Sequence, residues 1–182
     1  IQVDQPKVED QKVKMARIAA QVRASLSPLI DKDFIKVTYT KLWVEIEINT
    51  SILYSSGSAE LEIEAFTPLK KLSSVLKKLP NHIDVEGYTD NRPINTPAYP
   101  SNWELSASRA ASVVHLFAKQ GIAPKRLAAI GYGQYRPIGD NKTLKGRRKN
   151  RRVKVVILAD KNARRAAEIE KTAEPFASGA AQ

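Results

Sequence analysis

Three side chains near the middle of the sequence combine opposite charges with a hydrogen-bonding amide. Asp90 follows a short alternating segment, whereas Asn102 and Arg109 belong to a segment with helical periodicity. A guanidinium can hold a carboxylate through two parallel charge-assisted hydrogen bonds, and a helix N-terminus adds unpaired N–H groups that favour an anion. The carboxylate of Asp90 can receive an ammonium group. An acid and a base at a fixed separation therefore suit a ligand with a zwitterionic amino-acid end.

The same residues also have structural interpretations. Asp90 and Arg109 could form an ion pair that only ties a loop to a helix, and Asn102 could cap that helix. The chain has no cysteine and only two histidines, His82 and His115, which excludes a disulfide framework and a thiol nucleophile and argues against a histidine-rich metal centre. It shows neither a Ser-His-Asp order nor paired carboxylates. We therefore predict no catalytic residue, no metal ion and no cofactor.

The elements that must position these side chains follow from hydrophobic periodicity and from turn residues. A capping box formed by Ser101 and Glu104 predicts a helix over 101–120. Thr67 is predicted to cap an earlier helix that ends at Pro80. The remaining predicted elements are an N-terminal helix over 6–29, strands at 34–38, 42–48, 82–87, 126–133 and 152–158, and a C-terminal helix over 161–174.

This order predicts an α/β (α+β) two-layer sandwich, in which a mixed sheet with the core order β-α-β-α-β-β follows an N-terminal helical arm. The last two strands are expected to add an antiparallel edge. We divide the chain into a helical arm or linker at 1–33, a folded domain at 34–160 and a helical tail at 161–182 with a frayed end. The arm could pack on the domain, pack on a copy of itself, or link the domain to an upstream element. Because the chain starts with Ile1, we expect it to be a piece of a longer protein.

Positive charge is concentrated in one part of the sequence. The chain carries 30 lysines and arginines against 19 aspartates and glutamates, and residues 119–165 hold 15 of the basic residues but only Asp140 and Asp160. Eight of the 13 residues at 142–154 are basic. Such a stretch attracts nucleic acid, an anionic membrane surface or an anionic cell-wall polymer, unless it is only a solvated edge. We expect no nucleic-acid role, because the stretch has neither interleaved aromatic residues nor a recognition helix.

Several separated motifs point to a known family of domains. They occur in one order, at strand ends and helix starts: EGYTDNRPI at 86–94, SNWELSASRA at 101–110, AIGYGQYRP at 129–137 and KNRRVKVVIL at 149–158. Together they resemble the OmpA-like peptidoglycan-binding domain over about residues 40–160. The SGSAEL stretch at 56–61 and the proline-containing insertion before SNWELS are similar to the periplasmic domain of MotB-type flagellar stator proteins. The resemblance implies that the predicted mixed sheet has the form of the OmpA C-terminal domain.

The resemblance also implies a ligand and a set of site residues. In such domains the ligand is the diaminopimelate of the peptidoglycan stem peptide, whose free side-chain end carries an ammonium and a carboxylate. Asp90 would then receive the ammonium and Arg109 the carboxylate. Arg151 and Arg152 could instead support only the edge of the sheet, and Thr89 could be only a turn residue. The further site positions carried over from the motifs are Thr89, Asn102, Leu105, Ser106, Arg151 and Arg152.

The function implied by the resemblance is a non-catalytic anchor that holds an ion-conducting stator to the cell wall, so that torque can be applied to the rotor. The chain would be the periplasmic part of a single-pass inner-membrane protein whose membrane helix lies outside this sequence. The expected partners are a second copy of the chain, a MotA-type membrane subunit and flagellar ring proteins. An OmpA- or Pal-like tether of the outer membrane without a motor role is the alternative. Wall hydrolysis would require lytic activity that depends on Glu104 or Asp90.

Overall fold

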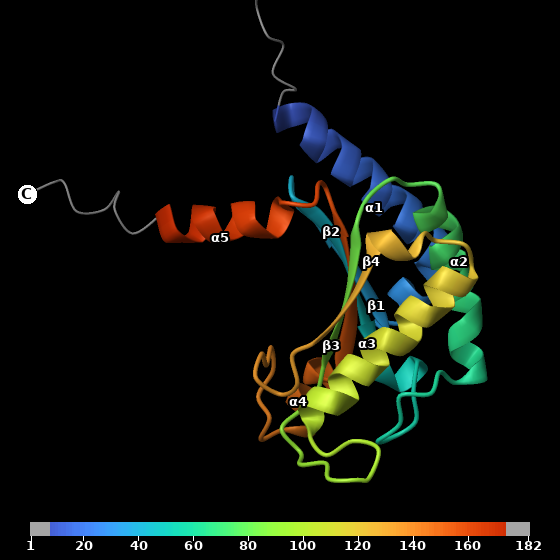
Figure 1. Ribbon diagram of the computed structural model, residues 1–182, viewed down its shortest axis with the longest axis vertical. Helices are drawn as coiled ribbons and strands as arrows, with labels where there is room; N and C mark the ends of the chain where they lie inside the picture. The colour runs from blue at the N-terminus through green and yellow to red at the C-terminus, as the bar shows by residue number, and fades with distance from the viewer. Residues whose placement is uncertain (1–7, 174–182) are drawn as a thin grey trace, which may run out of the picture.

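A computed structural model of the chain describes residues 8–173 and shows a five-stranded sheet with helices against one face (Figure 1). The hydrophobic core lies between that face and the first three helices, so the predicted two-layer α+β fold is confirmed. The elements are α1 (Val8–Asp31), β1 (Ile35–Tyr39), β2 (Trp43–Asn49), η1 (Thr50–Ile52), α2 (Ile63–Lys77), β3 (Ile83–Tyr88), α3 (Asn102–Lys119), η2 (Pro124–Arg126), β4 (Leu127–Gly131), α4 (Leu144–Asn150), β5 (Arg152–Leu158) and α5 (Ala163–Ala173).

The strands follow the order β1-β2-β5-β3-β4. β5 runs antiparallel to both β2 and β3, whereas β4 pairs with β3 in parallel. The expectation that the last two strands form an antiparallel edge is therefore wrong, because β5 returns to the centre of the sheet. Its sequence is consistent with this position: Val153 and Val155 join the main core, and Val156 is buried on the opposite face. A strand that is buried on both faces is apolar nearly throughout, without polar alternation.

The predicted N-terminal arm is the helix α1, and it packs on the domain itself. Met15, Ile18, Val22 and Leu26 are buried in the main core, and α1 contacts β1, β2 and α2. The helix continues past Pro28 to Asp31, a few residues beyond its predicted end. Of the arrangements that its amphipathic pattern allows, the structure contains the one in which α1 covers the sheet.

The second helix begins earlier than its sequence predicted. α2 starts at Ile63, with the extended backbone of Glu62 at its N-terminal cap, so Thr67 does not cap it. Pro68 lies inside the helix. As the sixth residue of α2, Pro68 lies past the first turn, so its missing N–H leaves the helix without one internal hydrogen bond. The prediction of Thr67 as a cap treated this proline as a first-turn residue.

Two glycines allow α3 to lie very close to the strands beneath it. A Cβ atom on Gly87 of β3 would lie 2.1 Å from the carbonyl oxygen of Ser106, and one on Gly131 of β4 would lie 2.6 Å from the amide nitrogen of Ala107. Since no real Cβ atom makes such contacts, a larger side chain would push the helix away. The position of α3 relative to the end of β3 is therefore set by backbone contact.

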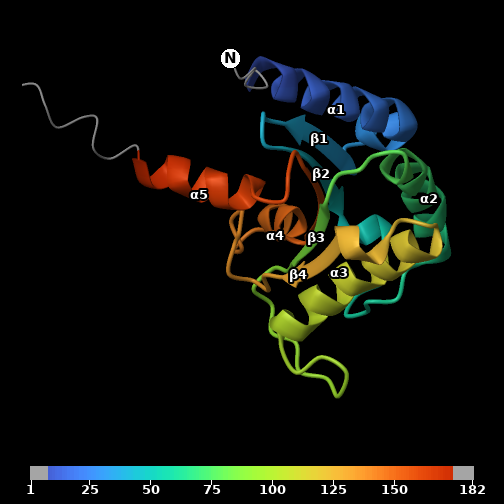
Figure 2. The ribbon, with the colours of Figure 1, turned by 45° about the horizontal axis from the view of Figure 1, so that its top comes forward.

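The C-terminal helix α5 points away from the sheet in both ribbon views (Figures 1 and 2). Its first residue, Ala163, is buried beside Val156 and Leu158, on the face of the sheet opposite the main core. The structure thus contains the helix predicted at 161–174 over Ala163–Ala173. The tail predicted at 175–182 lies outside the described residues.

Candidate ligand-binding site

A cavity of about 640 Å³ lies where β3 ends and α3 begins. Its wall comes from four segments that are distant in the sequence: 50–57, 89–96, the first two turns of α3, and 144–151. Six of the eight predicted site residues line it, namely Thr89, Asp90, Asn102, Leu105, Arg109 and Arg151. The fold therefore brings the acid and the arginine of the predicted pair to one cavity.

The carboxylate of Asp90 has a different ionic partner from the one considered in the sequence. Its Oδ2 accepts a hydrogen bond of 2.5 Å from Nη1 of Arg151, and its Oδ1 accepts one of 3.0 Å from the backbone N–H of Arg92. An ion pair between Asp90 and Arg109 does not occur among the described residues. The interpretation of these two residues as a structural pair is thus not what the structure contains.

Arg109 is held by the loop that precedes α2. Its Nε donates to the carbonyl oxygen of Ser58 at 2.8 Å, and its Nη2 donates to that of Ser55 at 3.4 Å. The guanidinium lies 5.0 Å from the ring centroid of Tyr54, whose hydroxyl donates to the carbonyl oxygen of Arg109 at 2.7 Å. Burial lowers the pKa of Arg109, and burial raises the pKa of Tyr54 to about 12. Sequence reasoning missed this role of Tyr54, Ser55 and Ser58. The two serines act through carbonyl oxygens, which leave no side-chain signature, and the contact of Tyr54 depends on the path of the loop.

The start of α3 is fixed by its cap and by an amide that ties two loops together. Ser101 is the N-terminal cap, as predicted, but it accepts a hydrogen bond from the N–H of Trp103, and its hydroxyl donates to the carboxylate of Glu104. Asn102 does not cap the helix. Its Nδ2 donates to the carbonyl oxygen of Arg92 and to Oε1 of Gln134, each at 3.0 Å. Asn102 therefore joins the loop after β3 to the loop after β4, and the role of Gln134 was not predicted.

Ser106 and Arg152 are the two predicted site residues that do not line the cavity. The Ser106 hydroxyl accepts from the N–H of Gly133 at 3.0 Å and donates to the carbonyl oxygen of Trp103. The Arg152 guanidinium lies 3.8 Å from the ring centroid of Tyr88, and burial lowers its pKa. Ser106 thus holds the loop after β4 against α3, and Arg152 supports the sheet.

The basic stretch at 142–154 contains a short helix that sequence reasoning did not predict. Thr143 caps α4 and accepts from the N–H of Gly146, while the side chain of Asn150 bonds back to the loop at 138–141. α4 places Arg147 at the cavity, and its Nη1 donates to the carbonyl oxygen of Asn141 at 2.9 Å. Thr143 is a typical helix-capping residue and could have indicated this helix, but the stretch was interpreted only by its charge.

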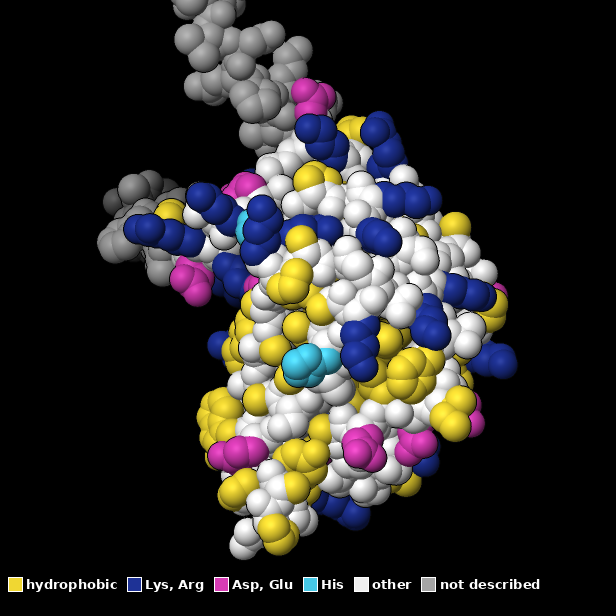
Figure 3. Space-filling model, turned by 45° about the vertical axis from the view of Figure 1, so that its right-hand side comes forward, with side chains coloured by type: hydrophobic (Ala, Val, Ile, Leu, Met, Phe, Trp, Pro, Cys, Tyr) yellow, Lys and Arg dark blue, Asp and Glu magenta, His cyan; other side chains and the backbone are white. Residues whose placement is uncertain are grey.

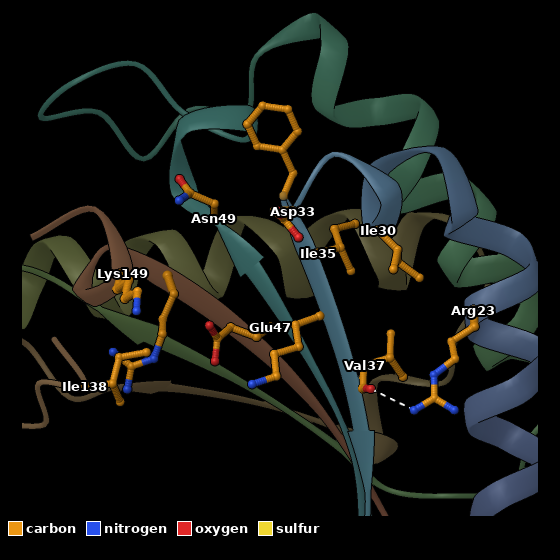
Figure 4. Close-up of a pocket in the computed structure, with 12 residues that line it drawn as sticks. Arg23, Ile30, Asp33, Ile35, Val37, Glu47, Asn49, Ile138 and Lys149 are labelled. Carbon is orange, nitrogen blue, oxygen red and sulfur yellow. Dashed lines mark hydrogen bonds between the residues drawn. The ribbon is translucent and has the colours of Figure 1, made fainter. Parts of the chain in front are cut away.

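Another cavity, of about 790 Å³, lies beside the edge strand β1 and does not combine the predicted acid and arginine (Figure 4). There Nη2 of Arg23 donates to the carbonyl oxygen of Val37, which satisfies one outward-facing acceptor of that edge strand. Of the predicted site residues only Arg152 lines it.

On the face formed by the helices, basic side chains are spread over the surface and do not gather in one patch (Figure 3).

Two further observations concern metals and membranes. Within residues 8–173, no group of three or more histidine, cysteine, aspartate or glutamate side chains could hold a metal ion. None of the described helices is long and apolar enough to cross a membrane.

Comparison with known proteins shows to which family the chain belongs. The Motility protein B of Bacillus subtilis (strain 168) is 41% identical over 115 residues, which cover 62% of this chain and 44% of that protein. A putative MotB-like protein from Desulfovibrio vulgaris superposes with a TM-score of 0.75 at 25% identity, covering 82% of this chain and 94% of that one. The cell wall anchor of the T6SS from Pseudomonas aeruginosa superposes with a TM-score of 0.71 at 33% identity, covering 76% and 97%.

The chain spans about half the length, or slightly less, of the curated relatives it matches. The OmpA family model matches residues 53–151, which include the whole of the cavity wall except its first residues. That match covers more than half of the chain and all six predicted residues at the cavity. This protein therefore belongs to the OmpA family, with MotB-type domains among its relatives.

Proposed function

We propose that this domain is a non-catalytic anchor that binds the peptide part of peptidoglycan. The observation that carries the proposal is the cavity at the end of β3, where Asp90 and Arg109 approach one solvent-accessible space from different elements. The ligand is the side-chain end of diaminopimelate, with its ammonium at Asp90 and its carboxylate at Arg109. Binding of this kind needs complementary charges and no bond breaking.

Asp90 can take an ammonium group although it already has partners. A carboxylate offers about four lone-pair sites, and the two bonds from Arg92 and Arg151 use one on each oxygen. The side chain of Arg151 is 33% exposed, so it can also turn toward solvent or toward the ligand. An incoming ammonium can therefore share Asp90 with Arg151 or replace it.

Arg109 is suited to hold a carboxylate in a fixed direction. Two of its nitrogen atoms are anchored to carbonyl oxygens, and the ring of Tyr54 lies against the guanidinium. The Nη1 atom has no hydrogen-bond partner among the described residues, which leaves its donors for a ligand. A buried, preoriented guanidinium loses little conformational entropy when it binds an anion.

A sedimentation assay with purified cell walls tests the proposal. We expect Asp90→Ala and Arg109→Ala each to weaken binding by well over tenfold, because removing one partner of a desolvated charge pair costs on the order of 2–5 kcal/mol. Free diaminopimelate should compete with the wall for the parent protein. The matched controls are Asp31→Ala and Arg148→Ala, which remove the same charges at exposed positions outside the cavity wall.

The proposal fails if both cavity variants sediment with the wall as the parent does. It also fails if Asp31→Ala and Arg148→Ala lose as much binding as the cavity variants, since general charge would then explain the attraction. Lytic activity of the parent that is lost in Asp90→Ala or in Glu104→Ala would contradict the non-catalytic role.

The anchoring role extends to a flagellar stator in the full-length protein. Support comes from the relatives named Motility protein B, which are longer than this chain. In this proposal the domain is periplasmic and dimeric, and a membrane part outside this sequence joins a MotA-type subunit. Light scattering at high concentration tests the dimer, and restored swimming of a stator-deficient strain by the full-length protein tests the motor role.

A second candidate is wall anchoring for an envelope machine other than the flagellar motor. The T6SS wall anchor supports it, because its identity of 33% exceeds the 25% of the MotB-like structure. Outer membrane porin F relatives likewise keep open a tether of the outer membrane. Wall binding that persists without any effect on swimming would favour these alternatives over a motor role.

A further inference from the structure

The wall of the cavity carries more positive than negative charge. Four arginines line it, Arg92, Arg109, Arg147 and Arg151, whereas Asp90 is its sole carboxylate. A zwitterionic ligand end brings one ammonium and one carboxylate, so it leaves this excess unchanged. Since uncompensated like charges around a partly desolvated space repel each other, a ligand with an additional negative charge would bind more favourably.

The hydrogen bonds show the same excess of donors. Asp90 accepts bonds on both of its oxygens from Arg92 and Arg151. Arg147 uses Nη1 to bond the carbonyl oxygen of Asn141, but its Nε is buried and has no partner among the described residues. A buried donor without an acceptor costs free energy, and such groups are rare in folded proteins. Arg147 therefore brings to the cavity wall a guanidinium whose donors are only partly used by the described residues.

We propose that Arg147 binds a second carboxylate of the ligand, so that this cavity selects a stem-peptide end that carries two free carboxylates and one ammonium. The inference rests on the proposed function, because it assigns a further group of the same peptide. Arg109 lies on α3 and Arg147 on α4, so the two carboxylates are held from different elements of the wall. Arg147 and Arg109 together then distinguish stem peptides with free carboxylates from those with amidated ones.

A stem peptide that ends in diaminopimelate has this set of groups. Its side-chain end presents an ammonium and a carboxylate, and its main-chain end presents the second carboxylate. Amidation of a carboxylate removes a full charge and replaces two acceptor oxygens by one acceptor and one donor group. We therefore expect a wall with amidated stem peptides to be a poorer partner than one with free acids.

Calorimetric titration with short synthetic peptides tests this inference. The probes are a tripeptide that ends in diaminopimelate with both carboxylates free and two analogues in which one or the other carboxylate is an amide. We expect each amide to bind the parent about tenfold more weakly, as for the loss of one charge-assisted hydrogen-bonded pair. Equal affinity for all three peptides would overturn the inference while leaving the proposed function intact.

Variants of Arg147 test whether this residue binds the second carboxylate. In Arg147→Gln the preference for the free acid over one of the two amides should fall from about tenfold to about onefold. Arg148→Gln is the matched control, because Arg148 is exposed on the same helix and does not line the cavity. It should keep the full preference.

The preference ratio separates recognition from folding. A general loosening of α4 weakens all three peptides alike and leaves their ratios unchanged, whereas loss of a carboxylate contact changes one ratio. Arg147→Lys should keep part of the preference, because it keeps the charge without the planar fork. Unchanged ratios in Arg147→Gln would overturn the assignment of Arg147. If no peptide competes with the wall at all, both this inference and the proposed function are wrong.

Discussion

Two clusters of buried charge lie at different places on the sheet and differ in their balance. At the cavity, Asp90 is the one carboxylate beside four arginines of the described wall, and the buried Nε of Arg147 has no acceptor among the described residues. On the face opposite the main core, Arg164 of α5 bonds both Asp84 and Glu86 of β3. The hydroxyl of Tyr88 also donates to Glu86. We call this second cluster balanced because its donors and acceptors are paired with one another, although one arginine faces two carboxylates. Such pairing stabilises the fold, whereas the cluster at the cavity keeps donors without acceptors among the described residues, and we propose that it binds a ligand.

The arginine pKa values reflect the same difference. Burial lowers the pKa of Arg109, and the surrounding acceptors do not offset it. Burial also acts to lower the pKa of Arg164, but its bonds to Asp84 and Glu86 outweigh burial and raise the pKa overall. Arg164 is thus satisfied by its protein partners, and Arg109 gains further stabilisation only when an anion arrives.

The largest expected effect on stability comes from breaking the balanced cluster. Arg164→Ala leaves Asp84 and Glu86 without their cation, although these residues are only 9% and 4% exposed. Because the side chain of Arg164 is itself 38% exposed, we expect the free energy of unfolding to fall by about 2–3 kcal/mol in urea denaturation, less than for removing one partner of a fully buried pair. Wall binding by the folded variant should stay at the parental level.

Arg165→Ala is the control for this variant, since Arg165 is exposed on the same helix. It should change stability by less than about 0.5 kcal/mol. If Arg164→Ala is as stable as Arg165→Ala, the balanced cluster does not stabilise the fold, and the proposed difference between the two clusters is wrong.

A substitution between the two clusters should affect both properties together. Gly87→Ala places a Cβ atom 2.1 Å from the carbonyl oxygen of Ser106, so α3 must move away from β3. We expect a loss of about 1–3 kcal/mol in the free energy of unfolding. Wall binding should also weaken, because α3 carries Asn102 and Arg109. Parental stability and parental binding in this variant would show that α3 can shift without disturbing the cavity.

The two buried tyrosines give each cluster its own response to alkaline pH. Burial raises the pKa of Tyr54 to about 12, and burial together with Glu86 raises the pKa of Tyr88. A tyrosine with a raised pKa in the folded state keeps its proton while the unfolded chain loses one above about pH 10. Stability is therefore unaffected below about pH 10 and falls as the pH rises toward 12.

Tyr54→Phe removes one titrating group from that window. At pH 7 we expect the free energy of unfolding of this variant to be about 1 kcal/mol below that of the parent, because the hydrogen bond to the carbonyl oxygen of Arg109 is missing. Between pH 10 and 12 the parent should lose up to about 2 kcal/mol more stability than the variant does, because only the parent has Tyr54 to titrate. Denaturation curves at several pH values measure this difference. An unchanged slope above pH 10 would mean that Tyr54 already ionises in the folded state at its ordinary pKa.

The sequence predicted the elements better than their arrangement. Hydrophobic alternation identified β2 because Val44 and Ile46 point to the core, and a capping box identified the start of α3. The central place of β5 depends on pairing between distant segments, which local periodicity does not contain. The motifs located Asp90 and Arg109 at one site. The partners of those residues, such as Arg151 and the carbonyl of Ser58, follow from loop paths that charge patterns do not reveal.

The smallest expected effect on stability is in the cavity, and it decides how binding data are interpreted. Asp90→Ala removes the partner of Arg151, but the side chain of Arg151 is 33% exposed and can bond water instead. We therefore expect the free energy of unfolding to change by no more than about 1 kcal/mol, as for pairs near the surface. Urea denaturation of Asp90→Ala beside Arg164→Ala measures the contrast. If Asp90→Ala is the less stable of the two variants, the pair of Asp90 with Arg151 holds the fold together. Weaker wall binding by Asp90→Ala would then be no evidence that the ligand binds at Asp90. If Asp90→Ala keeps parental stability and no longer binds the cell wall, the charged residues of the cavity form a binding site that is not required for folding.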